Sequence, residues 1–183
     1  MINNQIHIIE NFLSIEECNF ILNKCKEELT LTNAKVKSGY SKWRKSSIGR
    51  IDKINNINEK LIDLLKVLYN INGIEVSGLG PFQFTEYKVG EYFNWHSDRD
   101  GEDIYKDRFV SSIILLNDDY IGGILEIQDI NGSKIPTNQK MGNLYIFDSG
   151  LMHRVTPVEM GIRYSLVNWI SVIKTNNTNK SII

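Results

Sequence analysis

The sequence is short of the residues from which many protein sites are built, since its 183 residues include two cysteines and three histidines. Two thiols cannot form a cysteine-rich zinc site. Cys18 and Cys25 lie seven residues apart in a segment with helical periodicity, which puts their backbones about 10 Å apart, too far for a disulfide. We therefore expect two reduced thiols in a helix core, as suits a reducing compartment.

Long apolar runs are also absent. No stretch approaches the roughly 20 residues that span a bilayer, and the first residues lack the basic segment of a secretory signal. The net charge of -1 argues against a general nucleic-acid binder, whose affinity depends on many phosphate contacts. We expect a cytoplasmic protein with neither a membrane nor a nucleic acid as its partner.

Two helices are expected in the first part of the chain. Ser14 and Glu17 have the spacing of a capping box, which predicts a helix that begins there. The second helix should begin near Asn56. Their apolar stripes follow the helical period and consist of Cys18, Leu22, Cys25 and Leu29 in the first, and Ile57, Leu61, Leu64, Leu65 and Leu68 in the second.

From Gly78 onward, short β-type runs alternate with turn residues. The expected strands are 81–87, 92–97, 108–116, 123–127, 143–147, 153–158 and 163–173. Short strands after two helices predict a mainly β domain, an antiparallel sandwich or jelly roll fronted by the helices. One domain is expected over residues 1–174, with a helical front at 14–70, a jelly-roll core at 78–173 and a flexible tail at 175–183.

The segment between Glu28 and Asp52 carries six basic residues and no acidic one, with Tyr40 and Trp43 among them. Long connecting segments often close over a substrate, and cations interleaved with aromatics suit an acidic peptide or single-stranded nucleic acid. Residues 35–50 are therefore interpreted either as a substrate lid or as a solvated loop without a role in recognition.

His96, Ser97 and Asp98 form an H-x-D motif. Residues two apart in a strand project from the same face, so His96 and Asp98 can reach one metal ion. His153 begins an expected strand 57 residues later. Two imidazoles and one carboxylate match the facial triad of non-haem Fe(II) oxygenases, which leaves coordination positions open for catalysis. A structural zinc ion would instead take a fourth protein ligand, commonly a thiolate, and neither cysteine lies near these strands.

Arg163 follows His153 by ten residues, and Ser165 lies on the same strand face as Arg163. Residues 157–161 favour a turn, so we expect the strands of His153 and Arg163 to be antiparallel neighbours, with Arg163 deeper in the barrel. A guanidinium group is a planar fork suited to a carboxylate. The pattern fits a dicarboxylic acid that chelates the metal at one end and meets Arg163 at the other. The alternative is a surface arginine on a strand.

Three stretches together carry a family resemblance: Tyr87 to Asp98, Asp119 to Leu125, and Gly142 to Val158 with the following Gly161-Ile162-Arg163. They resemble the 2-oxoglutarate/Fe(II)-dependent dioxygenases, and within these the prolyl 4-hydroxylase-like branch. The N-terminal IIENFLSIEEC resembles the opening strand and capped helix of that branch, so the resemblance covers most of the chain. It implies a double-stranded β-helix, a jelly roll of the cupin type.

The resemblance also implies ligands. Fe(II) would be held by His96, Asp98 and His153, and 2-oxoglutarate by Arg163 with help from Ser165. O2 would be the second co-substrate and ascorbate a candidate reductant. Many collagen-type members have a lysine at the position of Arg163, which weakens the transfer of a collagen-like substrate to this chain.

Further residues are candidates for the pocket. Tyr87 matches the family tyrosine that hydrogen-bonds the co-substrate carboxylate, and its alternative role is that of a core aromatic. Asp148 and His7 are expected to be structural, in a turn and in an apolar strand. The candidates for contact with substrate, or for lining the pocket, are Asn94, Arg108, Trp169 and Trp43.

The leading hypothesis is hydroxylation of a prolyl residue in a protein or peptide, with release of succinate and CO2. Asp98 favours hydroxylation because related halogenases have a small residue in its place. The alternatives are hydroxylation of a small molecule such as a free amino acid, oxidative demethylation of a nucleobase, and a non-catalytic, cupin-like metal-binding module. Nucleobase demethylases typically carry a second arginine six residues after the first, where this chain has Trp169.

Overall fold

The computed structural model describes residues 6–34, 43–52, 54, 56–70, 74–99 and 108–174. The expected tail at 175–183 and residues 35–42 of the basic segment lie outside the described residues. The elements, in chain order, are β1 (Ile6–Ile9), α1 (Ile15–Glu28), β2 (Thr32–Asn33), β3 (Arg44–Lys45), β4 (Ser47–Ile51), α2 (Ile57–Asn70), β5 (Ile74–Leu79), β6 (Phe82–Tyr87), β7 (Tyr92–His96), β8 (Val110–Leu115), β9 (Ile121–Gly122), β10 (Leu125–Gln128), β11 (Lys134–Ile135), β12 (Leu144–Asp148), β13 (His153–Val155), β14 (Val158–Met160) and β15 (Arg163–Lys174).

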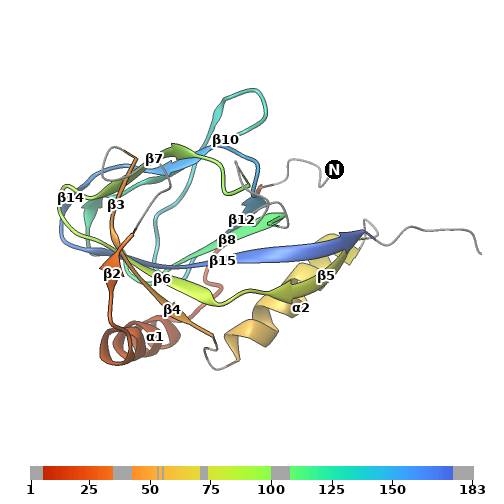
Figure 1. Ribbon diagram of the computed structural model, residues 1–183, viewed down its shortest axis with the longest axis horizontal. Coiled ribbons are helices and arrows are strands. Elements are labelled where there is room, and N and C mark those ends of the chain that lie inside the picture. The colour runs from red at the N-terminus through yellow and green to blue at the C-terminus, as the bar shows by residue number, and fades with distance from the viewer. Residues whose placement is uncertain are drawn as a thin grey trace, which may run out of the picture.

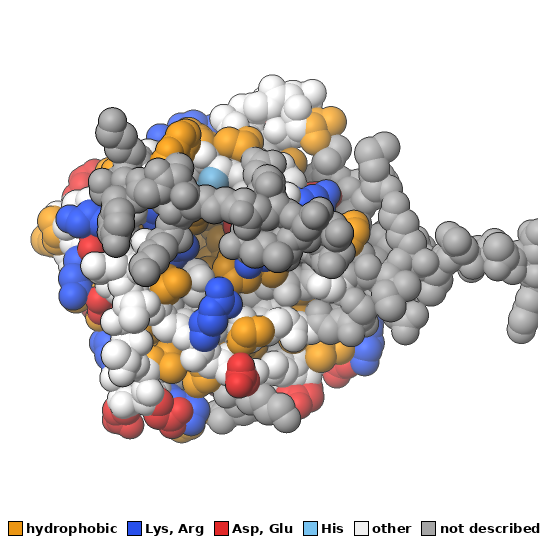
Figure 2. Space-filling view, in the orientation of Figure 1, with side chains coloured by type: hydrophobic (Ala, Val, Ile, Leu, Met, Phe, Trp, Pro, Cys, Tyr) orange, Lys and Arg blue, Asp and Glu red, His pale blue; other side chains and the backbone are white. Residues whose placement is uncertain are grey.

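Two antiparallel sheets face each other, with the helices below the larger one (Figure 1). The major sheet has the order β1-β12-β8-β15-β6-β4-β2, with β5 also paired to β15, and the minor sheet has the order β11-β10-β13-β7-β3. β9 and β14 form a separate two-stranded sheet. The expectation of a mainly β fold with two helices is thus confirmed. Side chains of both signs of charge are spread over the face of the molecule seen in Figure 2.

Helix α1 begins as its sequence predicts. The Ser14 hydroxyl accepts a hydrogen bond from the Glu17 backbone N–H at 3.2 Å, and the Glu17 carboxylate accepts one from the Ser14 N–H at 2.8 Å. These two bonds satisfy donors that the first helical turn leaves without partners. Cys18 and Cys25 are free, fully buried thiols, which confirms their expected packing role.

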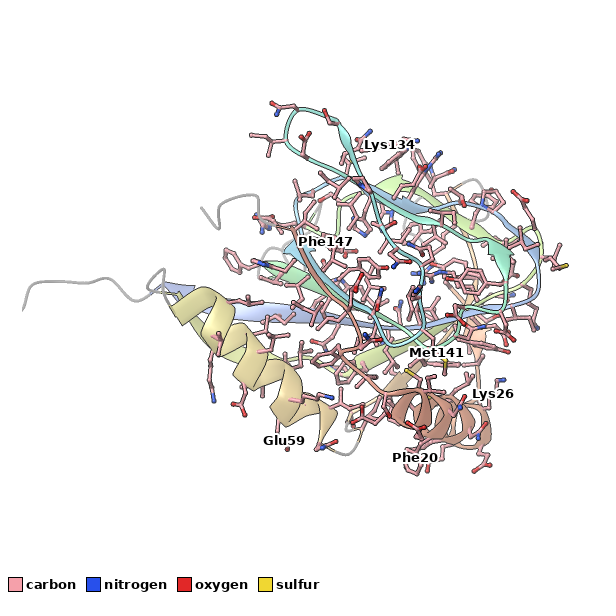
Figure 3. The ribbon with its side chains drawn as sticks, turned by 180° about the vertical axis from the view of Figure 1, so that it is seen from behind. Phe20, Lys26, Glu59, Lys134, Met141 and Phe147 are labelled. Carbon is pink, nitrogen blue, oxygen red and sulfur yellow. The ribbon has the colours of Figure 1, made fainter. Side chains whose placement is uncertain are left out.

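Strand alternation divides the interior into two cores. On β15, Tyr164, Leu166 and Ile170 point toward the helices and belong to the larger core. Residues of the opposite parity point between the sheets. The smaller core lies there and includes Tyr145 and Phe147 of β12. Figure 3 shows Phe147 at the sheets, away from Phe20 and Lys26 on α1 and Glu59 on α2.

Part of the basic segment is β-structure, which the sequence did not predict. β3 pairs with β7 in the minor sheet, and β4 pairs with β6 in the major sheet, with only Ser46 between the two strands. The expectation of a loop over residues 35–50 is therefore wrong for 44–45 and 47–50, which form strands. Short strands rich in Arg, Lys and Ser have no apolar alternation, so pairing with neighbours decides their conformation.

The expected pairing of the His153 and Arg163 strands is also wrong. β13 pairs with β7 and β10 in the minor sheet, whereas β15 pairs with β5, β6 and β8 in the major sheet. The intervening residues form β14 rather than a tight turn, and this strand crosses from one sheet to the other. His153 therefore lies in the minor sheet and Arg163 in the major sheet, on opposite sides of the interior between the two sheets.

Among the residues that the structure describes, no helix is both long and apolar enough to cross a membrane.

Candidate active site

The H-x-D motif and His153 meet at the paired ends of two strands of the minor sheet. His96 is the last residue of β7, His153 is the first residue of β13, and the two are cross-strand partners. Asp98 follows two residues after His96. One potential ligand atom from each of the three residues lies within 4.8 Å of the others. The structure therefore brings together the three residues that the sequence singled out as metal ligands.

Backbone carbonyl groups fix the orientation of both imidazoles. His96 Nδ1 lies 2.7 Å from the Asn94 carbonyl oxygen, and His153 Nδ1 lies 3.1 Å from the Leu151 carbonyl oxygen. A carbonyl only accepts, so each Nδ1 carries the proton and each Nε2 keeps its lone pair for a metal. The Nε2 atoms point at Asp98, with 3.8 Å from His96 to Oδ1 and 3.5 Å from His153 to Oδ2.

The electrostatics of the cluster keep His96 and Asp98 unprotonated. Burial and the nearby His153 lower the pKa of His96 to about 3, which leaves its imidazole neutral at physiological pH. Burial alone would raise the pKa of Asp98, but His153, His96 and the Ser111 hydroxyl outweigh it, and the net pKa is lowered. Neutral imidazole and ionised carboxylate are the forms that bind a divalent metal.

Arg163 forms a second polar group in the interior. It is 1% exposed, and its NH1 donates to Ser165 Oγ at 3.0 Å, but Nε and NH2 have no hydrogen-bond partner among the described residues. The Tyr120 hydroxyl nearby is likewise buried without a partner there. Burial raises the pKa of Tyr120, and the charge of Arg163 opposes that shift. A buried charge without a counter-ion is costly, so this group of residues calls for an anion.

Packing around Tyr87 places Arg163 about as far from the metal cluster as two residues along a strand. The guanidinium lies over the Tyr87 ring at 5.5 Å, and Tyr87 packs with Val155, which follows His153 by two residues on β13. Two residues of a strand span about 7 Å. A five-carbon dicarboxylate matches this separation, with one carboxylate at the metal and the other at Arg163.

The opposite sheet gives the same separation. Phe147 contacts the His153 ring edge-on, with ring centroids 4.8 Å apart. Tyr145 is two residues away on the same face of β12, and Arg163 is close enough to oppose the rise that burial causes in the pKa of Tyr145. The residues present therefore fit both a divalent metal and a dicarboxylate co-substrate.

The remaining sequence-predicted pocket residues are divided between the site and the surface. Tyr87 is 3% exposed and is the cross-strand partner of Arg163. Asn94 contributes its carbonyl to His96. Trp169 is near enough to Asp98 to affect its pKa, and Arg108 lies over the Trp169 ring at 3.8 Å.

Trp43 and Asp148 fit a role in the pocket less well. Trp43 is 51% exposed, although its carbonyl accepts a hydrogen bond from the Asn94 N–H at 2.7 Å. Asp148 accepts hydrogen bonds from the Gly150 N–H and from Arg99, each at 2.8 Å, as a residue that stabilises a turn would.

Sequence reasoning missed Tyr120, Ser111 and Ser149. Tyr120 precedes the Gly122-Gly123 pair, and the structure brings Gly123 close to both Arg163 and Tyr120. Ser111 and Ser149 carry no motif, and only the structure shows that they reach Asp98.

The two histidines of the cluster differ in exposure. The His96 side chain is 16% exposed, whereas His153 is buried. Figure 2 shows a histidine at the surface of this face.

Comparison with known proteins agrees with this geometry. The model of the 2OG-Fe(II) oxygenase superfamily matches residues 82–171, a range that contains the metal cluster and Arg163. A PKHD-type hydroxylase of Shewanella sp. (strain MR-7) is 29% identical over 175 residues, covering 88% of this chain and 76% of that protein. A PKHD-type hydroxylase of Cupriavidus pinatubonensis is 26% identical over 110 residues, but the match spans only 48% of its length.

Solved structures share the fold. A Pseudomonas putida prolyl-4-hydroxylase superposes with a TM-score of 0.73 at 24% identity, covering 92% of this chain and 93% of that one. A Trichoplax adhaerens prolyl hydroxylase, solved in complex with a peptide fragment of the hypoxia inducible factor oxygen degradation domain, gives a TM-score of 0.75 at 19% identity. It covers 92% of this chain and 84% of that one.

Two facing antiparallel sheets around a His-Asp-His cluster define a non-haem iron oxygenase of the double-stranded β-helix class. Residues 82–171 match the 2OG-Fe(II) oxygenase superfamily, and the chain is similar over most of its length to a PKHD-type hydroxylase and to a solved prolyl-4-hydroxylase. The cofactors of this chain are accordingly Fe(II) and 2-oxoglutarate, with O2 as the oxidant.

Proposed function

We propose that this enzyme hydroxylates a prolyl residue in a protein or peptide, with conversion of 2-oxoglutarate to succinate and CO2. The observation that carries the chemistry is the buried Arg163, two of whose nitrogens have no partner among the described residues, in the same interior as the His96, Asp98 and His153 cluster. The prolyl substrate is supported by the prolyl hydroxylases among the structural neighbours, one of them solved with a peptide.

Each group of residues has one task in this proposal. His96, Asp98 and His153 hold Fe(II), which supplies, together with 2-oxoglutarate and O2, the oxidant that inserts oxygen into a C–H bond. Arg163 and Ser165 bind the distal carboxylate of 2-oxoglutarate, and burial strengthens this charge pairing.

Neighbouring residues hold these groups in place. The Asn94 and Leu151 carbonyls keep the Nε2 lone pairs of both histidines directed at the metal position. Tyr87, packed under the guanidinium, orients Arg163. We further propose that residues 1–174 form one catalytic domain, because the helices pack on the same sheet that carries Arg163.

The substrate class can be tested with the purified full chain, Fe(II), 2-oxoglutarate and O2. A library of proline-containing peptides should yield products that have gained one oxygen by mass spectrometry. The matched library with each proline replaced by alanine should yield none. Oxygen gained equally by both libraries, or by free amino acids alone, would contradict the prolyl assignment while leaving the oxygenase chemistry intact.

A further inference from the structure

Asp98 receives support from a buried pair of hydroxyls, one on β8 of the opposite sheet and one in the turn that follows β12. The Ser111 hydroxyl of β8 donates to Asp98 Oδ2 at 2.7 Å, and the Ser111 and Ser149 hydroxyls lie 2.8 Å apart. Both serines are completely buried. On the same face of β8, Ile113 and Leu115 are apolar core residues, so Ser111 places a single hydroxyl within an otherwise apolar surface.

The direction of each hydrogen bond follows from the number of protons. Ser111 has one hydroxyl proton, which goes to the carboxylate, because an ionised carboxylate only accepts. The bond between the serines must therefore be donated by Ser149. The Ser149 hydroxyl thus orients Ser111, and Ser111 in turn holds one oxygen of Asp98.

Ser149 also ties down the backbone of the iron motif. Its carbonyl oxygen accepts from the Asp98 N–H at 2.9 Å and from the Ser97 hydroxyl at 3.1 Å. Asp98 lies two residues beyond the end of β7, where the strand ladder no longer fixes its position. The backbone and the side chain of Asp98 are consequently held from the major sheet, while His96 and His153 are held by the minor sheet.

We infer that Ser111, oriented by Ser149, is a positioning residue that holds the Asp98 carboxylate in its metal-binding orientation. The inference rests on the proposed function of the cluster. Groups that hydrogen-bond a metal ligand typically change metal affinity by 10–100-fold when they are removed. A serine in this place therefore sets how tightly the enzyme keeps its iron, although it does not touch the metal.

The test is titration of the metal-free full chain with Co(II), followed by visible absorption. Ser111→Ala should weaken Co(II) binding by about tenfold or more. Ser111→Thr, which keeps the hydroxyl, should bind close to wild type. Ser149→Ala should weaken binding less than Ser111→Ala does, because it removes only the group that orients Ser111.

Ser112 offers a matched control. It is the next residue on β8, is equally buried, and points to the other face, where its hydroxyl contacts the Asn168 carbonyl at 3.4 Å. Ser112→Ala should leave Co(II) affinity unchanged. Equal weakening by Ser112→Ala and Ser111→Ala would overturn the inference, because it would show general loosening of the strand.

Failure of the inference and failure of the proposed function can be told apart. If His153→Ala abolishes Co(II) binding while Ser111→Ala binds as wild type, only the role of Ser111 is refuted. If His153→Ala binds Co(II) as tightly as wild type, the cluster is not the metal site, and both the proposed function and the role of Ser111 are refuted.

Discussion

The backbone at Gly123 lies close to the side chains of Arg163 and Tyr120. Its φ is +58°, and an added Cβ would lie 3.0 Å from Arg163 Cδ and 3.3 Å from Tyr120 Cε2. Gly132 also has a positive φ, +81°, but an added Cβ there would meet nothing within 4 Å. The two glycines therefore share the backbone requirement but differ in their surroundings, since Gly123 is buried against Arg163, Val158 and Tyr120 whereas Gly132 is exposed.

Gly123→Ala should weaken 2-oxoglutarate binding, whereas Gly132→Ala should not. Both substitutions should lower the free energy of unfolding by about 1–2 kcal/mol, because alanine disfavours the left-handed region. Denaturant unfolding measures the stability loss, and the 2-oxoglutarate dependence of succinate formation measures binding. Equal 2-oxoglutarate dependence in the two variants would show that Gly123 serves the backbone alone.

Replacement of Arg163 tests the anion site itself. Arg163→Ala should raise the 2-oxoglutarate concentration needed for half-maximal turnover by roughly 150- to 5,000-fold, because it removes a buried charged partner worth roughly 3–5 kcal/mol. Metal binding should persist, since Arg163 is not among the ligand atoms. Arg154→Ala is the control, because Arg154 follows His153 on β13 but its side chain lies on the other face of the strand, where it pairs with Glu126. Unchanged 2-oxoglutarate dependence in Arg163→Ala would refute the assignment.

At the scale of elements, helix α1 buries its two thiols against the major sheet. Burial raises the pKa of both Cys18 and Cys25 to about 11, from an ordinary value of 9.0. At pH 8 both should be protonated and unreactive toward iodoacetamide in the native protein, but not in urea. Mass spectrometry of the alkylated chain checks this, and rapid native alkylation would contradict the buried position.

The same shift predicts a dependence of stability on pH. The folded state binds the thiol protons more tightly than the unfolded state, so the free energy of unfolding should fall as the pH rises from about 9 toward 11. A variant with both cysteines replaced by alanine should lack this part of the decline. Urea unfolding at pH 8 and pH 10 measures it, and an identical decline in the variant would rule out the thiols as its cause.

Elements with a strong local signal were predictable. The capping box at Ser14 and the apolar stripe after it define α1, and alternation defines most of the interior strands. β3 and β4 were not predictable, because their polar residues become strands only by pairing with β7 and β6. The pairing partner of β13 was also predicted wrongly. The short separation along the chain favoured β15, but β14 carries the chain from one sheet to the other, and β13 pairs with β7.

At the scale of the whole molecule, the site depends on the two sheets facing each other. The minor sheet supplies His96 and His153, and the major sheet supplies Arg163 and, through Ser111, the support for Asp98. Residue spacing and chemistry singled out His96, Asp98 and His153, which the structure brings together, and Arg163, which it buries. Ser111 and Tyr120 could not be identified in that way, because their roles come from contacts between distant strands.

Succinate formation from 2-oxoglutarate in the presence of the proline peptide library tests the iron site most directly. The wild-type chain should form succinate in equal amount to the oxygenated peptide, and only with Fe(II) and O2 present. His153→Ala should form neither product, while Arg154→Ala should behave as wild type. Succinate formed at the wild-type rate by His153→Ala would contradict the central claim that the His96, Asp98 and His153 cluster is the iron site.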